Sequence, residues 1–145
     1  MKPISHLFLI TITLCAISCS LLQETFSGPK EAQQAFHLND AHVRTYKFND
    51  LLSLKLILND FLNQYQMGLS ALKKEARTIS IPDRAAHERR LTLIEREMRI
   101  IEAHVDNFPL LYADEWVKEK ESLDGLFDEL YQNYREAYLK LYPVP

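Results

Sequence analysis

The sequence predicts an all-α fold, an elongated antiparallel three-helix bundle arranged up-down-up over residues 49–145. Apolar residues recur at alternating steps of three and four through three long segments, which places them on one face of a helix in each segment. Only three glycines occur in 145 residues, and prolines fall between the segments. Because short connections favour antiparallel neighbours, and a helix rises about 1.5 Å per residue, the expected shape is a rod.

The first long helix is expected from about Asp50 to Arg77. Either Asn49 or Asp50 can cap it, because each side chain can accept a hydrogen bond from a free amide of the first turn. Three further leucines widen its apolar face beyond a coiled-coil seam, which suits a helix packed on two neighbours. The main stripe is Leu51, Leu54, Leu58, Phe61, Tyr65 and Leu72, and the widening residues are Leu52, Leu62 and Leu69.

The second helix is expected to open at "SIPD", residues 80–83, where Ser80 precedes Asp83 by three positions and Pro82 lies near the first turn. It should end at "DNFP", because Pro109 removes an amide and disfavours helical geometry at Phe108. Its stripe is Leu91, Ile94, Met98, Ile101, Val105 and Phe108.

The third helix is expected to start between Pro109 and Asp114 and to run to about Leu141. Asp114 and Glu115 would favour its first turn, since carboxylates are stabilised near the positive end of a helix. Its stripe is Trp116, Leu123, Phe127, Leu130, Tyr134, Ala137 and Leu141.

Residues 1–18 have the layout of a secretory signal peptide. Lys2 gives a positive start, an apolar run follows from Leu7 to Leu14, and small residues stand at Ala16 and Ser18. A membrane-spanning helix is the alternative, but it needs roughly 20 predominantly apolar residues. The run here is shorter and is interrupted by threonines and serines.

The sequence "AISC", Ala16 to Cys19, resembles the lipobox of bacterial lipoproteins, in which a small residue precedes the cysteine that becomes lipidated. The usual leucine is replaced by Cys15. The resemblance implies that Cys19 becomes the first residue of the mature chain, with a diacylglycerol on sulfur and an acyl chain, such as palmitate, on its amine. Several acyl chains give stable anchoring. Ser20 after the cysteine implies an outer-membrane position facing the periplasm.

This processing would leave no free thiol, because Cys15 departs with the signal peptide and Cys19 is alkylated. The expected organisation is a signal peptide over residues 1–18, a tether with a possible short helix over 19–48, and the bundle over 49–145. Loss of Lys2 changes the formal net charge from −3 to −4. A mildly acidic chain without a basic stripe predicts no nucleic-acid partner.

Catalytic motifs are not found in the sequence, and the chain is expected not to be an enzyme. "HERRL", residues 87–91, lacks the second histidine of a zinc-protease helix, because Leu91 stands there. The acids of the third helix suit a solvated face better than an acid–base pair in two distinct environments. "HLNDAH", residues 37–42, has two interpretations, a metal site or a polar linker in which two histidines are neighbours by composition alone. We expect no metal and no cofactor.

Two faces are candidates for binding a protein partner. The last helix carries Tyr131, Tyr134, Tyr138 and Tyr142 along one side, and tyrosine is enriched at interface hot spots. The same spacing also fits the edge of a core. The second helix carries Arg89 and Arg96, which could dock a partner through planar donors or belong to a solvated, salt-bridged face.

The combined features predict a lipid-anchored envelope protein that acts as a non-enzymatic adaptor or assembly factor through a helical face. Its size and anchor resemble the small helical pilotin lipoproteins that escort outer-membrane secretion proteins, a likeness of architecture without a shared motif. The alternatives are a module that binds a small ligand or metal, and a surface-exposed or secreted helical protein that acts on a host or competitor.

Overall fold

The computed structural model describes residues 28–38, 43–78 and 80–143, and these residues form helices joined by short turns. No strand occurs among them, so the predicted all-α fold is confirmed. In chain order the α-helices of the described residues are α2 (Lys30–Phe36), α3 (Leu51–Thr78), α4 (Arg84–Asp106) and α5 (Ala113–Leu141). Three short 3-10 helices accompany them, η1 (Val43–Thr45), η2 (Phe48–Asp50) and η3 (Phe108–Leu110).

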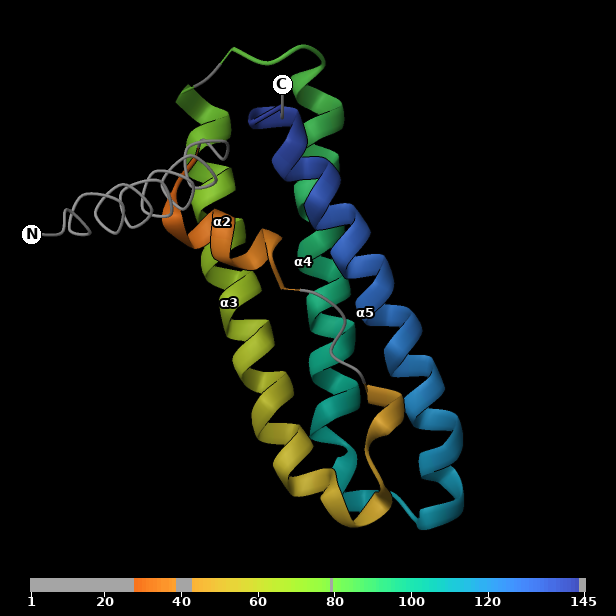
Figure 1. The fold of residues 1–145 in the computed structure, drawn as a ribbon. Helices are drawn as coiled ribbons and strands as arrows, with labels where there is room; N and C mark the ends of the chain where they lie inside the picture. The colour runs from red at the N-terminus through yellow and green to blue at the C-terminus, as the bar shows by residue number, and fades with distance from the viewer. Residues whose placement is uncertain (1–27, 39–42, 79, 144–145) are drawn as a thin grey trace, which may run out of the picture.

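The three longest helices lie along the long axis of the molecule, and α2 lies against the upper half of α3 (Figure 1). Contacts join α3 to α4, α4 to α5 and α3 to α5, and α2 contacts both α3 and α5. One end of the molecule is formed by η2, the start of α3, η3 and the start of α5. The opposite end contains the α3–α4 connection and the end of α5 (Figure 1).

The helix ends agree with the sequence prediction except at the start of α4. Asp83, rather than Ser80, is the N-cap residue, and its side chain accepts a hydrogen bond from the amide of Ala86 at 3.3 Å. Asp83 has a φ of 53°, in the left-handed region. Short polar side chains tolerate this region better than other non-glycine residues do. The helix therefore begins three residues later than the serine motif suggested.

The predicted stripes form most of the core. Every stripe residue of α5 is buried, as is every stripe residue of the second segment from Leu91 to Phe108. In α3 the stripe is buried at Leu54, Leu58, Tyr65 and Leu72, with Leu62 and Leu69 beside it. Leu52 is an exception, because 77% of it is exposed, and its inclusion in the buried face was wrong.

Part of the segment that was expected to be a tether packs into this core. Ala32 and Ala35 of α2 are fully buried, and so is Val43 of η1. The Tyr134 hydroxyl donates to the carbonyl oxygen of Ala32 at 3.2 Å, and the Tyr65 hydroxyl donates to that of Leu38 at 3.2 Å. The α2 segment is therefore part of the helical body, although its seven residues show too little periodicity to be assigned from the sequence.

Gly68 makes the close approach of α2 possible. A Cβ atom built at residue 68 would lie 2.3 Å from the Tyr134 hydroxyl and 2.6 Å from the Cβ of Ala35. Both distances are shorter than any allowed contact, and Tyr134 is fully buried with no room to withdraw. Glycine within a helix costs about 1 kcal/mol relative to alanine, so its presence here is explained by packing.

We expect Gly68→Ala to lower the free energy of unfolding by about 1–3 kcal/mol, the usual effect of overpacking a core. Gly125→Ala provides the matched control, because a Cβ atom there meets nothing within 4 Å. It should raise the free energy of unfolding by about 0.5–1 kcal/mol through helix propensity alone. Urea denaturation followed by circular dichroism measures both changes. Equal effects of the two substitutions would contradict the packing role of Gly68.

Candidate functional site

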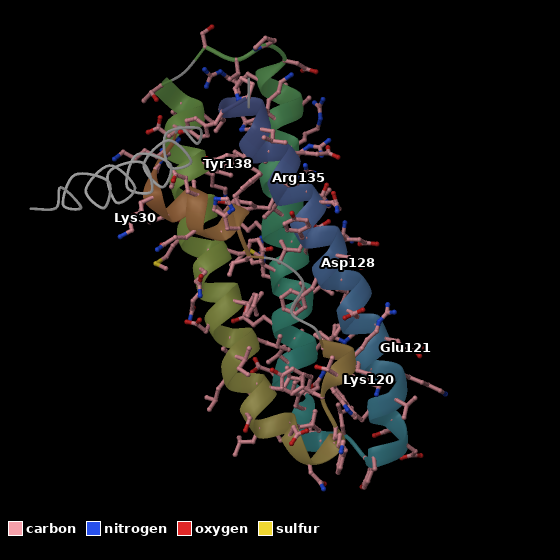
Figure 2. The ribbon with its side chains drawn as sticks, in the orientation of Figure 1. Lys30, Lys120, Glu121, Asp128, Arg135 and Tyr138 are labelled. Atoms are coloured by element: carbon pink, nitrogen blue, oxygen red, sulfur yellow. The ribbon has the colours of Figure 1, made fainter. Side chains whose placement is uncertain are left out.

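Most of the tyrosine stripe belongs to the core, and its assignment as a docking surface was wrong for three of its four residues. Tyr134 and Tyr138 are fully buried, Tyr142 is 9% exposed, and only Tyr131 is half-buried. The ring of Tyr138 packs 4.5 Å from that of Phe36 in α2. Figure 2 shows Tyr138 directed into the bundle, whereas Glu121, Asp128 and Arg135 line the outside of α5.

Burial also determines the protonation of these tyrosines. Desolvation raises the pKa of Tyr65 and of Tyr134 well above the usual value of 10.0, because an ionised phenol would lose its hydration. The same effect, with the neighbouring Glu75 carboxylate adding to it, raises the pKa of Tyr142 to about 12. These hydroxyls therefore stay protonated to higher pH than an exposed tyrosine does, and those of Tyr65 and Tyr134 donate hydrogen bonds in the core.

Arg89 and Arg96 lie on the exposed face of α4. Neither forms an ion pair within the described part of the chain. Leu93 and Ile100 interleave with them at helical spacing and are 41% and 36% exposed. The next arginine along this face, Arg99, lies 3.9 Å from Glu95. Both guanidinium groups are thus exposed and unpaired among the described residues, and their role in docking a partner stays a prediction.

The largest exposed apolar side chains gather at one end of the molecule, in η2, η3 and the first turns of α3 and α5. The sequence pattern did not identify this surface, because its residues come from two short stretches, 48–56 and 110–117, that lie far apart in the chain. We call it the end patch. Its members are Phe48 at 36% exposed, Leu52 at 77%, Leu56 at 68%, Leu110 at 75%, Tyr112 at 72% and Val117 at 53%.

Isolated exposed apolar residues are normal, but a cluster of several such residues marks an interaction surface. Here η3 contacts both α3 and α4, so Leu110 lies beside the start of α3. The Lys55–Asp106 ion pair, with 3.0 Å between Nζ and Oδ1, ties the same turns of α3 and α4 together. The end patch is therefore presented on a surface held together by packing and charge.

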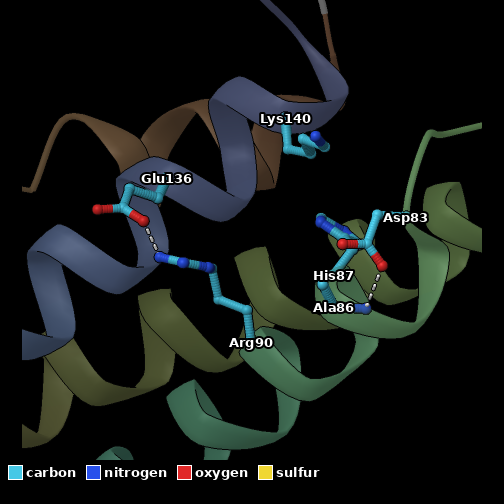
Figure 3. A pocket seen from close by; sticks show the side chains of 6 residues that line it. All are labelled: Asp83, Ala86, His87, Arg90, Glu136 and Lys140. Atoms are coloured by element: carbon cyan, nitrogen blue, oxygen red, sulfur yellow. Dashed lines mark hydrogen bonds and ion pairs between the residues drawn. The ribbon is translucent and has the colours of Figure 1, made fainter.

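A second feature lies at the opposite end, between the first turn of α4 and the last turns of α5. A cavity of about 190 Å³ is lined there by Asp83, Ala86, His87, Arg90, Glu136 and Lys140 (Figure 3). His87 is only 3% exposed, and its Nε2 atom has no hydrogen-bond partner among the described residues. Burial, helped by the charges of Lys140 and Arg90, lowers the pKa of His87 below 6.5.

The sequence pattern explains the burial of His87 but does not indicate a role for it. It precedes Leu91 by four residues and Ile94 by seven, so it continues the buried stripe of α4 by one turn. Glu97 is a second polar residue buried in this helix, at 6% exposed. Burial raises its pKa, while Asn133 of α5 donates to its Oε1 atom at 2.6 Å. Neither residue was a candidate from the sequence.

Metal binding has no support in the described residues, where no group of three or more histidine, cysteine, aspartate or glutamate side chains is arranged to hold an ion. His37 lies at the end of α2 with its ring 5.3 Å from that of Phe36. Asp40 and His42 lie outside the described residues, as does Cys19. His104 contacts Glu119 across the α4–α5 interface, with 2.6 Å between Nδ1 and Oε1.

None of the helices in the described ranges is both long and apolar enough to span a membrane. Comparison of the chain with protein-family models, with curated protein sequences and with solved structures found no match.

The lowered pKa of His87 predicts that the fold loses stability in mild acid. In the unfolded chain His87 binds a proton near pH 6.5, whereas in the folded chain it binds a proton only at a lower pH. The free energy of unfolding should therefore fall as the pH drops below 6.5, by up to about 1.4 kcal/mol for each unit that separates the two pKa values. The loss should level off below the folded pKa.

Chemical denaturation between pH 8 and pH 4, compared with His87→Gln, checks this expectation. The difference between the two curves isolates residue 87 from Glu97, whose raised pKa acts in the opposite direction. A difference that does not change with pH would contradict the expectation.

Proposed function

We propose that this chain is a lipid-anchored, non-enzymatic protein of the bacterial envelope that acts as an adaptor or assembly factor by docking a protein partner. Cys19 would carry the acyl chains, at the outer membrane and facing the periplasm. The three long helices would form an antiparallel up-down-up bundle that is the rigid part of the protein. The short helix α2 would pack against the side of this bundle. The observation that supports this proposal is the end patch and its position relative to the anchor.

The chain enters the helical body at the end opposite the end patch. A Cβ atom at Gly28 would lie 2.9 Å from the ring of Tyr142, which caps the C-terminus of α5. Cys19 precedes Gly28 by nine residues, which can span at most about 30 Å. The 28 residues of α3 give a helix of about 42 Å. An anchor at Cys19 would thus hold one end near the membrane and leave the end patch displayed away from it.

The exposed chemistry of the end patch suits a protein partner. Its members are large and mostly aliphatic, with one tyrosine, and the fully buried centres of interfaces are apolar with few charges. Such residues contribute most to the binding free energy when a complementary apolar surface of the partner covers them. Arg89 and Arg96 lie farther along α4 and could provide polar contacts at the edge of a larger interface.

The anchor is tested by the intact mass of the protein extracted from membranes. We expect the wild-type chain to begin at Cys19 and to carry added acyl mass, and we expect Cys19→Ala to lose both the processing and the added mass. Retention of Met1, or cleavage that leaves an unmodified thiol, would refute lipidation at this position.

The docking surface is tested by photocrosslinking in intact cells from a photoreactive residue at position 56 or 110. We expect a discrete crosslinked partner that binds at least about tenfold more weakly when Leu52→Asp is combined with either probe, or Leu110→Asp with the probe at position 56, since hot-spot truncations typically exceed 1 kcal/mol. Met67→Asp is the control, because Met67 is 50% exposed on α3 but outside the end patch.

Circular dichroism verifies that each of these variants is folded. Crosslinks that persist in the Leu52 and Leu110 variants, or that are lost equally in the Met67 variant, would reject the end patch as the docking surface. If the only crosslinks formed are between copies of this chain, the end patch is an interface of a homo-oligomer, and the adaptor proposal is wrong.

A further inference from the structure

We infer that the cavity between α4 and α5 is a binding site for a small phosphate group. It lies at the end of the molecule opposite the end patch, so it is a separate site from the proposed docking surface. Figure 3 shows that its side chains come from two helices, Asp83, His87 and Arg90 from the start of α4 and Glu136 and Lys140 from the end of α5. Its volume of about 190 Å³ suits a small ligand rather than a peptide.

The first observation is a buried polar atom without a partner. His87 is 3% exposed and lines the cavity, and its Nε2 atom has no hydrogen bond within the described part of the chain. In Figure 3 its ring projects from α4 toward the last turns of α5. Buried polar groups are nearly always satisfied, so an exception points to a missing partner. A neutral imidazole can donate from Nε2 to an oxygen atom placed in the cavity.

The second observation is the distribution of charge among the lining residues. Both carboxylates are already engaged, Asp83 by the amide of Ala86 and Glu136 by the guanidinium of Arg90. Lys140, in contrast, forms no hydrogen bond or ion pair with another described residue. The groups left to recognise a ligand are therefore an ammonium group and an imidazole, and both can donate hydrogen bonds.

The third observation is the helix end that borders the cavity. α4 has 23 residues and begins at Arg84 after its N-cap Asp83, whose side chain accepts from the amide of Ala86. Asp83, Ala86 and Lys140 line the same cavity, so the positive end of the helix dipole borders it. Helix N-termini stabilise anions, and phosphate in particular. A phosphate group also offers several acceptor oxygens, enough to bind His87 and Lys140 together. The combination favours an oxyanion of phosphate chemistry over a cation or an apolar molecule.

Two sources could supply this phosphate group, free inorganic phosphate and the headgroup of a phospholipid. The headgroup alternative rests on the proposed anchor, because Gly28 enters the body at the same end and would bring the cavity toward the membrane surface. Binding of free phosphate does not depend on the anchor, so the two proposals can fail separately.

The test is a titration of the full chain, carrying Cys19→Ser so that no acyl chain is attached, with potassium phosphate followed by amide NMR. We expect saturable shifts confined to the first turn of α4 and the last turns of α5. Lys140→Gln and His87→Gln should each raise the Kd at least about tenfold, as removal of a strong phosphate hydrogen bond does. Lys118→Gln is the matched control, an exposed lysine near the other end of α5.

The absence of saturable shifts, or equal weakening by Lys118→Gln and Lys140→Gln, would overturn the proposal. Because Lys140 is exposed, its variant remains informative even if His87→Gln fails to fold. A parallel titration with soluble dihexanoyl phosphatidylglycerol separates the two sources. Lys140-dependent binding of both probes supports the site with a headgroup as ligand, and binding of inorganic phosphate alone supports the site with the free ion.

Discussion

The hydrogen bond from the Tyr134 hydroxyl to the carbonyl oxygen of Ala32 is the interaction on which the arrangement of this molecule depends. It joins residues 102 positions apart in the chain, and it is fully buried. It can form only because residue 68 of the intervening helix α3 has no side chain. One glycine thus lets three helices meet at a single point, with the tyrosine ring also packed 5.3 Å from that of Tyr65.

The same constraint explains why the two ends of the molecule differ. Around α2 the aromatic rings of Phe36, Tyr138 and Tyr142 pack against one another in succession, with ring centroids 4.5 Å and 5.1 Å apart. At the other end η2 and η3 cover the core only in part. Phe108 and Trp116 are buried there against each other, whereas Leu110 and Tyr112 between them in the chain remain exposed. The most exposed large apolar side chains, Leu52, Leu110 and Tyr112, therefore lie at the end that α2 does not reach.

The long helices could be predicted from the sequence because their signal is periodic and extends over many turns. The stripes from Leu91 to Phe108 and from Trp116 to Leu141 are buried without exception. The role of α2 could not be predicted in this way, because seven residues with two buried alanines give almost no periodic signal. Its position is decided by long-range contacts, chiefly with Gly68 and Tyr134.

The candidate sites were harder to predict for a related reason. A tyrosine at helical spacing can be core or interface, and only the position of α2 decides that Tyr134 and Tyr138 are core. The end patch combines residues from separate short stretches, and the cavity beside His87 combines the start of one helix with the end of another. Arg89 and Arg96 lie on an exposed face of α4, and their role as docking residues stays a prediction.

The contact between Gly28 and the ring of Tyr142 has a mechanical consequence for a chain held at Cys19. If Cys19 carries the proposed anchor, tension on it would pass to Gly28, the first residue that the structure describes, whose carbonyl oxygen accepts a hydrogen bond from the Gln33 side chain at 2.8 Å. The load would then pass into α2 and spread over its broad contact with α3 and α5. The force would then act on the sides of the long helices rather than on their ends, so it would not unwind them from a terminus. In this arrangement α2 would transmit the force from the membrane anchor to the bundle.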